Sequence, residues 1–201
     1  GLTDAQQTLL DEALARVGTL CHEANKCGIP LLLDAEQSHR QQAVHHIATE
    51  LMRRFNRDGR VVLFDTIQMY LKDSPQRVET SLEVARTEGF VYAVKLVRGA
   101  YWEQERHSGK VFTSKEETDL AYDAAVDKLL RAKETSIIIA THNRHSIQQA
   151  CNGLDKLGIP RSSSRVHFAQ ILGMVDNITS GLAAAGFNAN KLVVFGLVHD
   201  V

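Results

Sequence analysis

Short apolar runs alternate along the chain with longer segments in which apolar residues recur at helical spacing. The short runs end at glycine or polar residues, a pattern that predicts buried strands. In the longer segments apolar residues recur three or four positions apart, which predicts amphipathic helices. The expected strands are 29–34, 60–68, 91–98, 136–143, 165–173 and 191–196.

The expected helices carry local signals at their ends. A capping-box pattern begins at Thr3, and Gly28 is expected to end the helix that follows. Ser74 is expected to cap a later helix, with Pro75 at its first position and Gly89 just past its end. The remaining helices are expected at 38–55, about 114–133, 145–157 and 175–185.

The repeated strand–helix unit predicts an α/β fold. A unit recurs about every thirty residues, which favours a parallel sheet with right-handed crossovers. A dinucleotide-binding sheet is not favoured, because no G-x-G-x-x-G follows a strand. A TIM-type (β/α)8 barrel fits better, although a full barrel has eight units and typically ~250 residues. We therefore expect 1–201 to form one barrel domain of about six units, lacking the first strands and the last helix.

Composition excludes several classes of function. The formal net charge of −1 provides no positive field for nucleic acid. Cys21, Cys27 and Cys151 lack C-x-x-C spacing, so reduced thiols are expected and a metal site is not. No apolar run approaches the length of a membrane span, and no signal peptide opens the chain.

Polar residues follow most of the expected strands. In β/α barrels the chemistry lies at the carboxyl ends of the strands. The residues found there are Asp34, Gln68, Lys95 to Tyr101, Thr141 to Asn143, and Gln170. Each has a structural alternative: Asp34 could cap a turn, Gln68 could satisfy a loop, and His142 could be a satisfied core histidine. Their recurrence at one end of successive strands favours a site.

Strand 91–98 contains two cations. Because side chains alternate across a strand, Lys95 is expected to point into the barrel mouth and Arg98 to lie at the rim, reaching solvent or a phosphate. A buried ammonium needs an anionic or electron-rich partner. The alternative is an ion pair of Lys95 with Asp34 or Glu36.

The residues after this strand are suited to a flat ligand. Gly99 permits close approach of a ligand to the backbone, and Tyr101 and Trp102 offer flat surfaces for a ring. Thr113 and Lys115 stand at a helix start, where an anion could bind or where the residues could form only a solvated cap.

Five segments together resemble the proline dehydrogenase family. They are LLLDAEQ (31–37), TIQMYLKD (66–73), KLVRGAYWEQE (95–105), ATHN (140–143) and FAQILGM (168–174). The resemblance covers essentially the whole chain. It implies a distorted (β/α)8 barrel that holds FAD at the strand carboxyl ends and oxidises L-proline to Δ1-pyrroline-5-carboxylate by hydride transfer to the flavin.

The resemblance also implies roles for individual residues. Lys95 is expected beside the flavin N5 edge. Asp34, Tyr101 and Ile171 are expected to face the substrate, and Asp34, Lys95 and Tyr101 to form the catalytic set. The other cofactor-binding residues implied are Gln68, Val97, Gly99, Ala100, Trp102, Thr113, Lys115, Thr141, His142, Asn143 and Gln170.

The family's usual setting implies a quinone as electron acceptor and peripheral membrane association. The form KLVRGAY implies a mitochondrial member, with the bacterial cytoplasm as the alternative.

The chain departs from the family pattern near its end. Leu192 stands where the family usually has a tyrosine over the substrate, and Val194 where proline is common. The family's early lysine-bearing strand and its final arginine-bearing helix are also expected to be absent. Three alternatives stay open: hydroxyproline dehydrogenase, a non-catalytic barrel acting as an interaction or regulatory module, and, more distantly, a non-flavin barrel enzyme.

Overall fold

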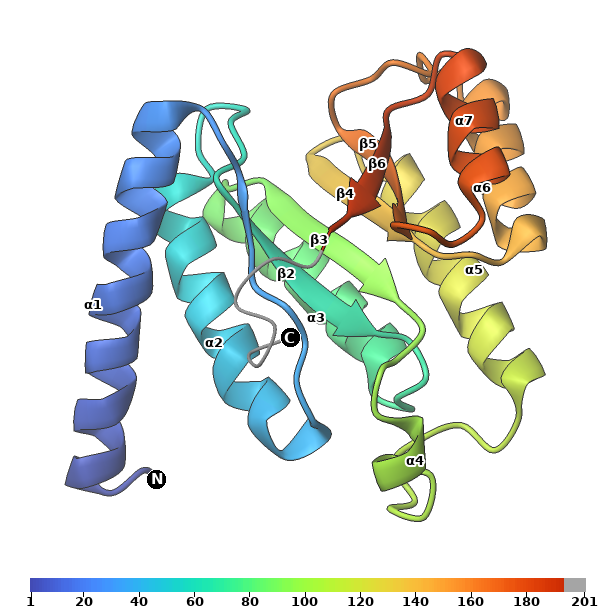
Figure 1. Ribbon diagram of the computed structural model, residues 1–201. Helices are drawn as coiled ribbons and strands as arrows, with labels where there is room; N and C mark the ends of the chain where they lie inside the picture. The colour runs from blue at the N-terminus through green and yellow to red at the C-terminus, as the bar shows by residue number, and fades with distance from the viewer. Residues whose placement is uncertain (194–201) are drawn as a thin grey trace.

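A curled sheet of six parallel strands forms the centre of the computed structural model, which describes residues 1–193 (Figure 1). The strands lie side by side in chain order. They are β1 (Leu31–Leu32), β2 (Leu63–Gln68), β3 (Tyr92–Val97), β4 (Thr135–Ala140), β5 (Val166–Ile171) and β6 (Ala189–Leu192). The architecture is that of an incomplete β/α barrel, as the repeated unit predicted.

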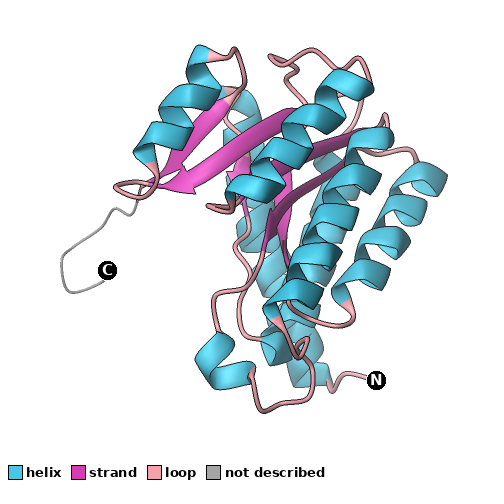
Figure 2. Ribbon diagram, turned by 90° about the vertical axis from the view of Figure 1, so that its right-hand side faces the viewer, coloured by secondary structure: helices cyan, strands magenta, loops and turns pink. Residues whose placement is uncertain are grey.

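Helices connect the strands and cover one side of the sheet (Figure 2). They are α1 (Asp4–Cys27), α2 (Ser38–Phe55), α3 (Ser74–Glu88), α4 (Trp102–Glu105), α5 (Lys115–Arg131), α6 (Arg144–Lys156) and α7 (Asp176–Ala184). A helical return between neighbouring parallel strands brings every strand's carboxyl end to the same edge. No helix among residues 1–193 is both long enough and apolar enough to span a membrane.

The core lies between the sheet and its helices. All six residues of β2 are buried, as expected for a central parallel strand. The largest fully buried apolar side chains are Tyr92, Tyr122, Phe168, Leu51, Met52, Leu63, Ile67, Met69, Leu96, Leu129, Leu130 and Ile137.

The predicted helix ends agree closely with the structure. Thr3 caps α1 in a full capping box, and Gly28 ends it with a left-handed φ of 66°. Gly89 ends α3 in the same way, with φ 71°. The prediction for Ser74 is wrong by one position: Asp73 is the N-cap, and the Ser74 hydroxyl instead donates to the Gln68 carbonyl at 2.7 Å.

The predicted strands 60–68 and 136–143 are shorter in the structure, where β2 begins at Leu63 and β4 ends at Ala140, and three further predictions also differ. The run 29–34 pairs as a strand only at Leu31–Leu32, because β1 has a neighbour on one side only. The short helix α4 lies in a connection for which no helix was predicted. The last strand begins at Ala189 rather than at 191, and residue 194 onward, including Val194, lies outside the described residues.

Candidate functional site

Lys95 points to the inner side of the curled sheet and pairs with Asp34. The Lys95 side chain is 10% exposed, whereas that of Asp34 is 68% exposed. Within residues 1–193, the Lys95 ammonium donates a hydrogen bond to the Asp34 carboxylate. The predicted direction of Lys95 is therefore confirmed, and so is the ion pair that was its alternative. Because an ammonium carries three N–H groups, the pair leaves Lys95 able to donate further.

Gln68 and Glu36 connect three loops at the mouth of the sheet. The Gln68 amide donates to the Glu36 carbonyl at 2.9 Å and accepts from the Ala100 backbone N–H at 2.9 Å. The Tyr101 hydroxyl donates to the Glu36 carboxylate at 3.0 Å. Gln68 therefore bonds backbone groups of the neighbouring loops, as the structural alternative for this residue predicted. The loops after β1, β2 and β3 are held in one arrangement.

The packing of the protein itself requires glycine at position 99. Its φ is +152°, and a Cβ built on it would lie 2.5 Å from the ring of Tyr70. The close approach predicted for a ligand at this position is thus made by the protein's own aromatic ring. The sequence offered no sign of this, because Tyr70 is distant along the chain.

Arg98 does not reach outward to solvent, and that prediction is wrong. Its guanidinium donates to Asp119 at 2.6 Å, Thr141 at 2.6 Å and Ser146 at 2.8 Å. It also lies 4.3 Å from the centre of the Tyr122 ring. Arg98 therefore ties the end of β3 to α5 and to the segment after β4.

The carboxylate of Asp119 is the anionic partner of this cluster. Burial opposes its ionisation, but hydrogen bonds from Lys115 and Arg98 outweigh burial and lower the pKa of Asp119. A charge-assisted bond of this kind is stronger than a neutral one. The physical reason that Arg98 turns inward is thus an acceptor that the strand pattern does not reveal.

At the start of α5 a carboxylate of the chain occupies the position expected for an anion. Glu117 accepts from the Thr113 N–H at 2.9 Å, the Thr113 hydroxyl at 2.7 Å and the Ser114 N–H at 3.1 Å. Lys115 pairs with Asp119. Thr113 and Ser114 thus form a solvated helix cap with Glu117, which was the predicted alternative to an anion site.

The segments after β4 and β5 contact each other. The His142 Nε2 atom accepts from the Ile171 N–H at 3.1 Å, and the Gln170 amide donates to the Thr141 carbonyl at 3.3 Å. Asn143 caps α6 through its side chain. The structure therefore brings together the residues predicted on these two loops.

Exposed apolar side chains accompany these polar groups at the carboxyl ends of β3, β5 and β6. They are Trp102, Ile171, Leu172, Met174, Leu192 and Val193, between 40% and 57% exposed. Large apolar residues gathered at one edge are typical of a ligand site. A flat aromatic cofactor with polar edges fits this combination of apolar surface and Lys95 donors.

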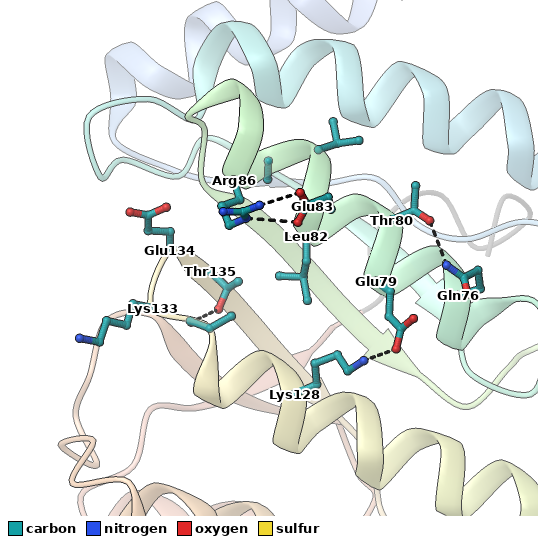
Figure 3. Close-up of a pocket in the computed structure, with 13 residues that line it drawn as sticks. Gln76, Glu79, Thr80, Leu82, Glu83, Arg86, Lys128, Lys133, Glu134 and Thr135 are labelled. Atoms are coloured by element: carbon teal, nitrogen blue, oxygen red, sulfur yellow. Dashed lines mark hydrogen bonds and ion pairs between the residues drawn. The ribbon is translucent and has the colours of Figure 1, made fainter.

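A groove lies elsewhere, on the helical side. It holds about 800 Å³ and is lined by α3 and by the segment from α5 to the start of β4. The Lys128–Glu79 ion pair crosses it (Figure 3). None of the predicted site residues lines this groove. Within residues 1–193, no three His, Cys, Asp or Glu side chains are grouped as metal ligands.

Three residues that shape the mouth were missed by sequence reasoning. Glu36 was considered only as an ion-pair partner, while Tyr70 and Glu105 were not considered. All three lie inside the family-like segments, and this is the one signal that could have identified them.

Comparisons with known proteins show the family to which the chain belongs. A family model described as proline dehydrogenase matches residues 3–201. The mitochondrial proline dehydrogenase 1 of Bos taurus is 33% identical over 203 residues, covering 99% of this chain and 34% of the bovine protein. The hydroxyproline dehydrogenase of Xenopus laevis is 30% identical over 212 residues, covering 100% of this chain and 45% of that protein.

Solved structures share the fold. Proline utilization A from Bdellovibrio bacteriovorus, inactivated by N-propargylglycine, superposes with a TM-score of 0.84 at 25% identity. The match covers 92% of this chain and 20% of that one. The chain thus spans about a third of the bovine protein and a smaller share of the bacterial one. Its family model, matched from residue 3 to residue 201, places the chain in the proline dehydrogenase family, whose members are in general flavoenzymes acting on proline.

Proposed function

We propose that this protein oxidises L-proline to Δ1-pyrroline-5-carboxylate with FAD as its cofactor. The observation that carries the proposal is the Lys95–Asp34 pair, set among exposed apolar side chains at the carboxyl ends of the strands. When bound, the flavin supplies the hydride acceptor. The protein supplies binding, orientation and charge.

Lys95 has the central role toward the cofactor. Asp34 holds the ammonium at the mouth, and the remaining N–H groups of Lys95 would donate to an electron-rich edge of the flavin ring. A fixed positive charge there favours electron density moving toward that edge. The ring itself is held by Gln68, Val97, Gly99, Ala100 and Trp102.

The segments after β4 and β5 supply further cofactor contacts. Thr141, His142, Asn143 and Gln170 are the residues we assign there. Thr113 and Lys115 hold the phosphate and ribose region, which requires the Glu117 carboxylate to give up its bonds to Thr113.

Substrate contacts come from Asp34, Tyr101 and Ile171. Tyr101 and Ile171 offer apolar surface to the pyrrolidine ring, and Tyr101 is oriented by its bond to Glu36. The exposed Asp34 carboxylate lies where it can accept a hydrogen bond from the substrate amine. Holding the substrate ring against the cofactor lowers the entropic part of the barrier.

The experiment uses the protein in its full length. Anaerobic addition of L-proline to the FAD-loaded protein is expected to bleach the flavin absorbance. A protein that cannot be loaded with FAD, or whose flavin stays oxidised with proline, contradicts the proposal.

Hydroxyproline oxidation is the second candidate, favoured by the similarity to the Xenopus protein. Rates of bleaching with L-proline and with 4-hydroxyproline, measured on one preparation, distinguish the two. Leu192, 48% exposed at the end of β6, stands where the family usually has a tyrosine over the substrate.

The cellular setting follows the relatives. We place the protein in the mitochondrion, on the inner-membrane or matrix side, with a quinone as electron acceptor and peripheral attachment to the membrane. Residues 1–201 then form part of one barrel domain. Reoxidation of the reduced flavin by a soluble quinone analogue, compared with oxygen, tests the acceptor.

A further inference from the structure

We propose that Glu105 is a positioning residue that holds Tyr101 and Trp102 at the mouth of the sheet. The claim about substrate binding rests on the proposed function, whereas the claim about the position of α4 does not. The Glu105 carboxylate accepts its hydrogen bonds from Ser38 and Tyr70. Neither of these residues belongs to the Lys95–Asp34 pair or to the predicted cofactor residues.

Glu105 is a buried carboxylate with two donors. It is 5% exposed, and it accepts from the Tyr70 hydroxyl at 2.6 Å and from the Ser38 backbone N–H at 2.5 Å. Burial opposes its ionisation, but the bonds from Tyr70 and Ser38 outweigh burial and lower the pKa of Glu105. A buried charge satisfied in this way fixes the position of the backbone that carries it.

Helix α4, which carries Glu105, is too short to be stable without tertiary contacts. Helix α4 runs only from Trp102 to Glu105, and its N-cap residue Tyr101 makes no side-chain capping bond. A single turn is unstable in water without tertiary contacts. Helix α4 lies in the long connection between β3 and α5 (Figure 1), and the position of Trp102 in it therefore depends on the bonds at the two ends of the helix.

Both ends of α4 are attached to the same segment. At its start the Tyr101 hydroxyl donates to Glu36, and at its end Glu105 accepts from Ser38. These two partners lie just before and at the start of α2. Breaking the Glu105 bond leaves the Tyr101–Glu36 bond before α4 and the Lys110–Ser38 bond five residues beyond its end, so the aromatic pair gains freedom.

Tyr70 connects Glu105 to the turn after β3. Its hydroxyl bonds Glu105 while its ring lies against Gly99. The carboxylate thus fixes the ring that sets the path of the chain from Gly99 to Trp102.

The test compares Glu105→Ala, Glu105→Gln and Tyr70→Phe with the matched control Glu103→Ala. Glu103 lies on the same short helix, but its side chain is 76% exposed. Glutamine is expected to restore much of the function, because its amide can accept from Ser38 and donate to the Tyr70 oxygen. Phenylalanine keeps the ring beside Gly99 and removes one bond.

The first readout needs no flavin. Trp102 is the one tryptophan of the chain, and it is 40% exposed, so full exposure would raise its accessibility about 2.5-fold. We expect acrylamide quenching of Trp102 fluorescence in the apo-protein to rise about twofold in Glu105→Ala and less in Glu105→Gln and Tyr70→Phe. Any other tryptophan of the full-length protein is replaced by phenylalanine beforehand. Wild-type quenching in Glu105→Ala overturns the proposal.

The second readout is steady-state kinetics with L-proline. We expect Glu105→Ala to raise KM about tenfold while kcat changes little, since binding of the substrate ring is lost first. Glu103→Ala is expected to match the wild type. If the wild type fails to reduce its flavin with proline, the proposed function fails, and the quenching comparison still decides the position of α4. If Glu105→Ala does not fold, Tyr70→Phe and Glu105→Gln decide: wild-type quenching in both overturns the proposal.

Discussion

Replacing Gly99 with alanine tests how closely the turn after β3 is packed. The new Cβ would lie 2.5 Å from Cδ1 and 2.6 Å from Cε1 and Cγ of Tyr70. Distances this short require the ring or the backbone to move. The φ of +152° adds a second cost, because L side chains rarely adopt it.

The two costs can be estimated separately. A residue forced into a sparsely populated backbone region costs about 1–3 kcal/mol. Overpacking a filled site costs about 1–3 kcal/mol more. The Tyr70 ring cannot move freely, since its hydroxyl is held by the buried Glu105 carboxylate. We expect the free energy of unfolding to fall by about 2–6 kcal/mol, a large part of the ~5–15 kcal/mol of a typical domain.

Urea denaturation of the purified protein measures this loss. Gly109→Ala is the matched control, because Gly109 also has a positive φ, of 74°, but a Cβ there meets no atom within 4 Å. It should show the backbone cost alone. In a Tyr70→Ala background the effect of Gly99→Ala should shrink to a similar value. Equal losses for Gly99→Ala with and without the Tyr70 ring would refute the packing argument.

Three further substitutions test other parts of the chain. His45→Ala should lower the free energy of unfolding by about 1–3 kcal/mol, because Asp65, 0% exposed and 2.5 Å from His45 Nδ1, loses that side-chain partner and keeps the Thr66 N–H. Adding Asp65→Asn should recover part of this in urea denaturation. Val175→Gly should raise the melting temperature, since a β-branched residue at φ 47° is strained by about 1 kcal/mol or more. Lys95→Ala should weaken FAD binding or slow flavin reduction, whereas Cys151→Ala should change neither, and equal behaviour of the two would contradict the site.

Much of the fold was predictable because its signals are local. The capping box at Thr3 and the glycines at 28 and 89 act on their nearest neighbours in sequence, and the structure has them as predicted. The order of the strands follows from short connections between parallel neighbours. Helix α4 was not predictable in this way, since four residues show no periodicity and its stability comes from contacts with Glu36 and Ser38.

The direction of Lys95 in the candidate site was predictable, but the contacts of its neighbours were less so. Alternation along β3 correctly directed Lys95 inward, because that follows from strand geometry alone. Arg98 lies at the end of the strand, where alternation no longer decides, and its direction is set by Asp119, Thr141 and Ser146. These partners come from other strand–helix units, so a single segment cannot reveal them.

The mouth of the sheet is therefore held by its own side chains before any ligand arrives. Gln68 has both ends of its amide bonded, Gly99 lies against Tyr70, and Glu117 occupies the donors of Thr113. The Gln68 and Gly99 arrangements preorganise loops, whereas the proposed role of Thr113 at a phosphate requires its bonds to Glu117 to break. Preorganised loops lower the free-energy cost of binding a ligand, whereas an internal anion that must first be displaced raises that cost. In the proposed function, the affinity for the cofactor therefore depends on freeing Thr113 from Glu117 as well as on contacts with the ring.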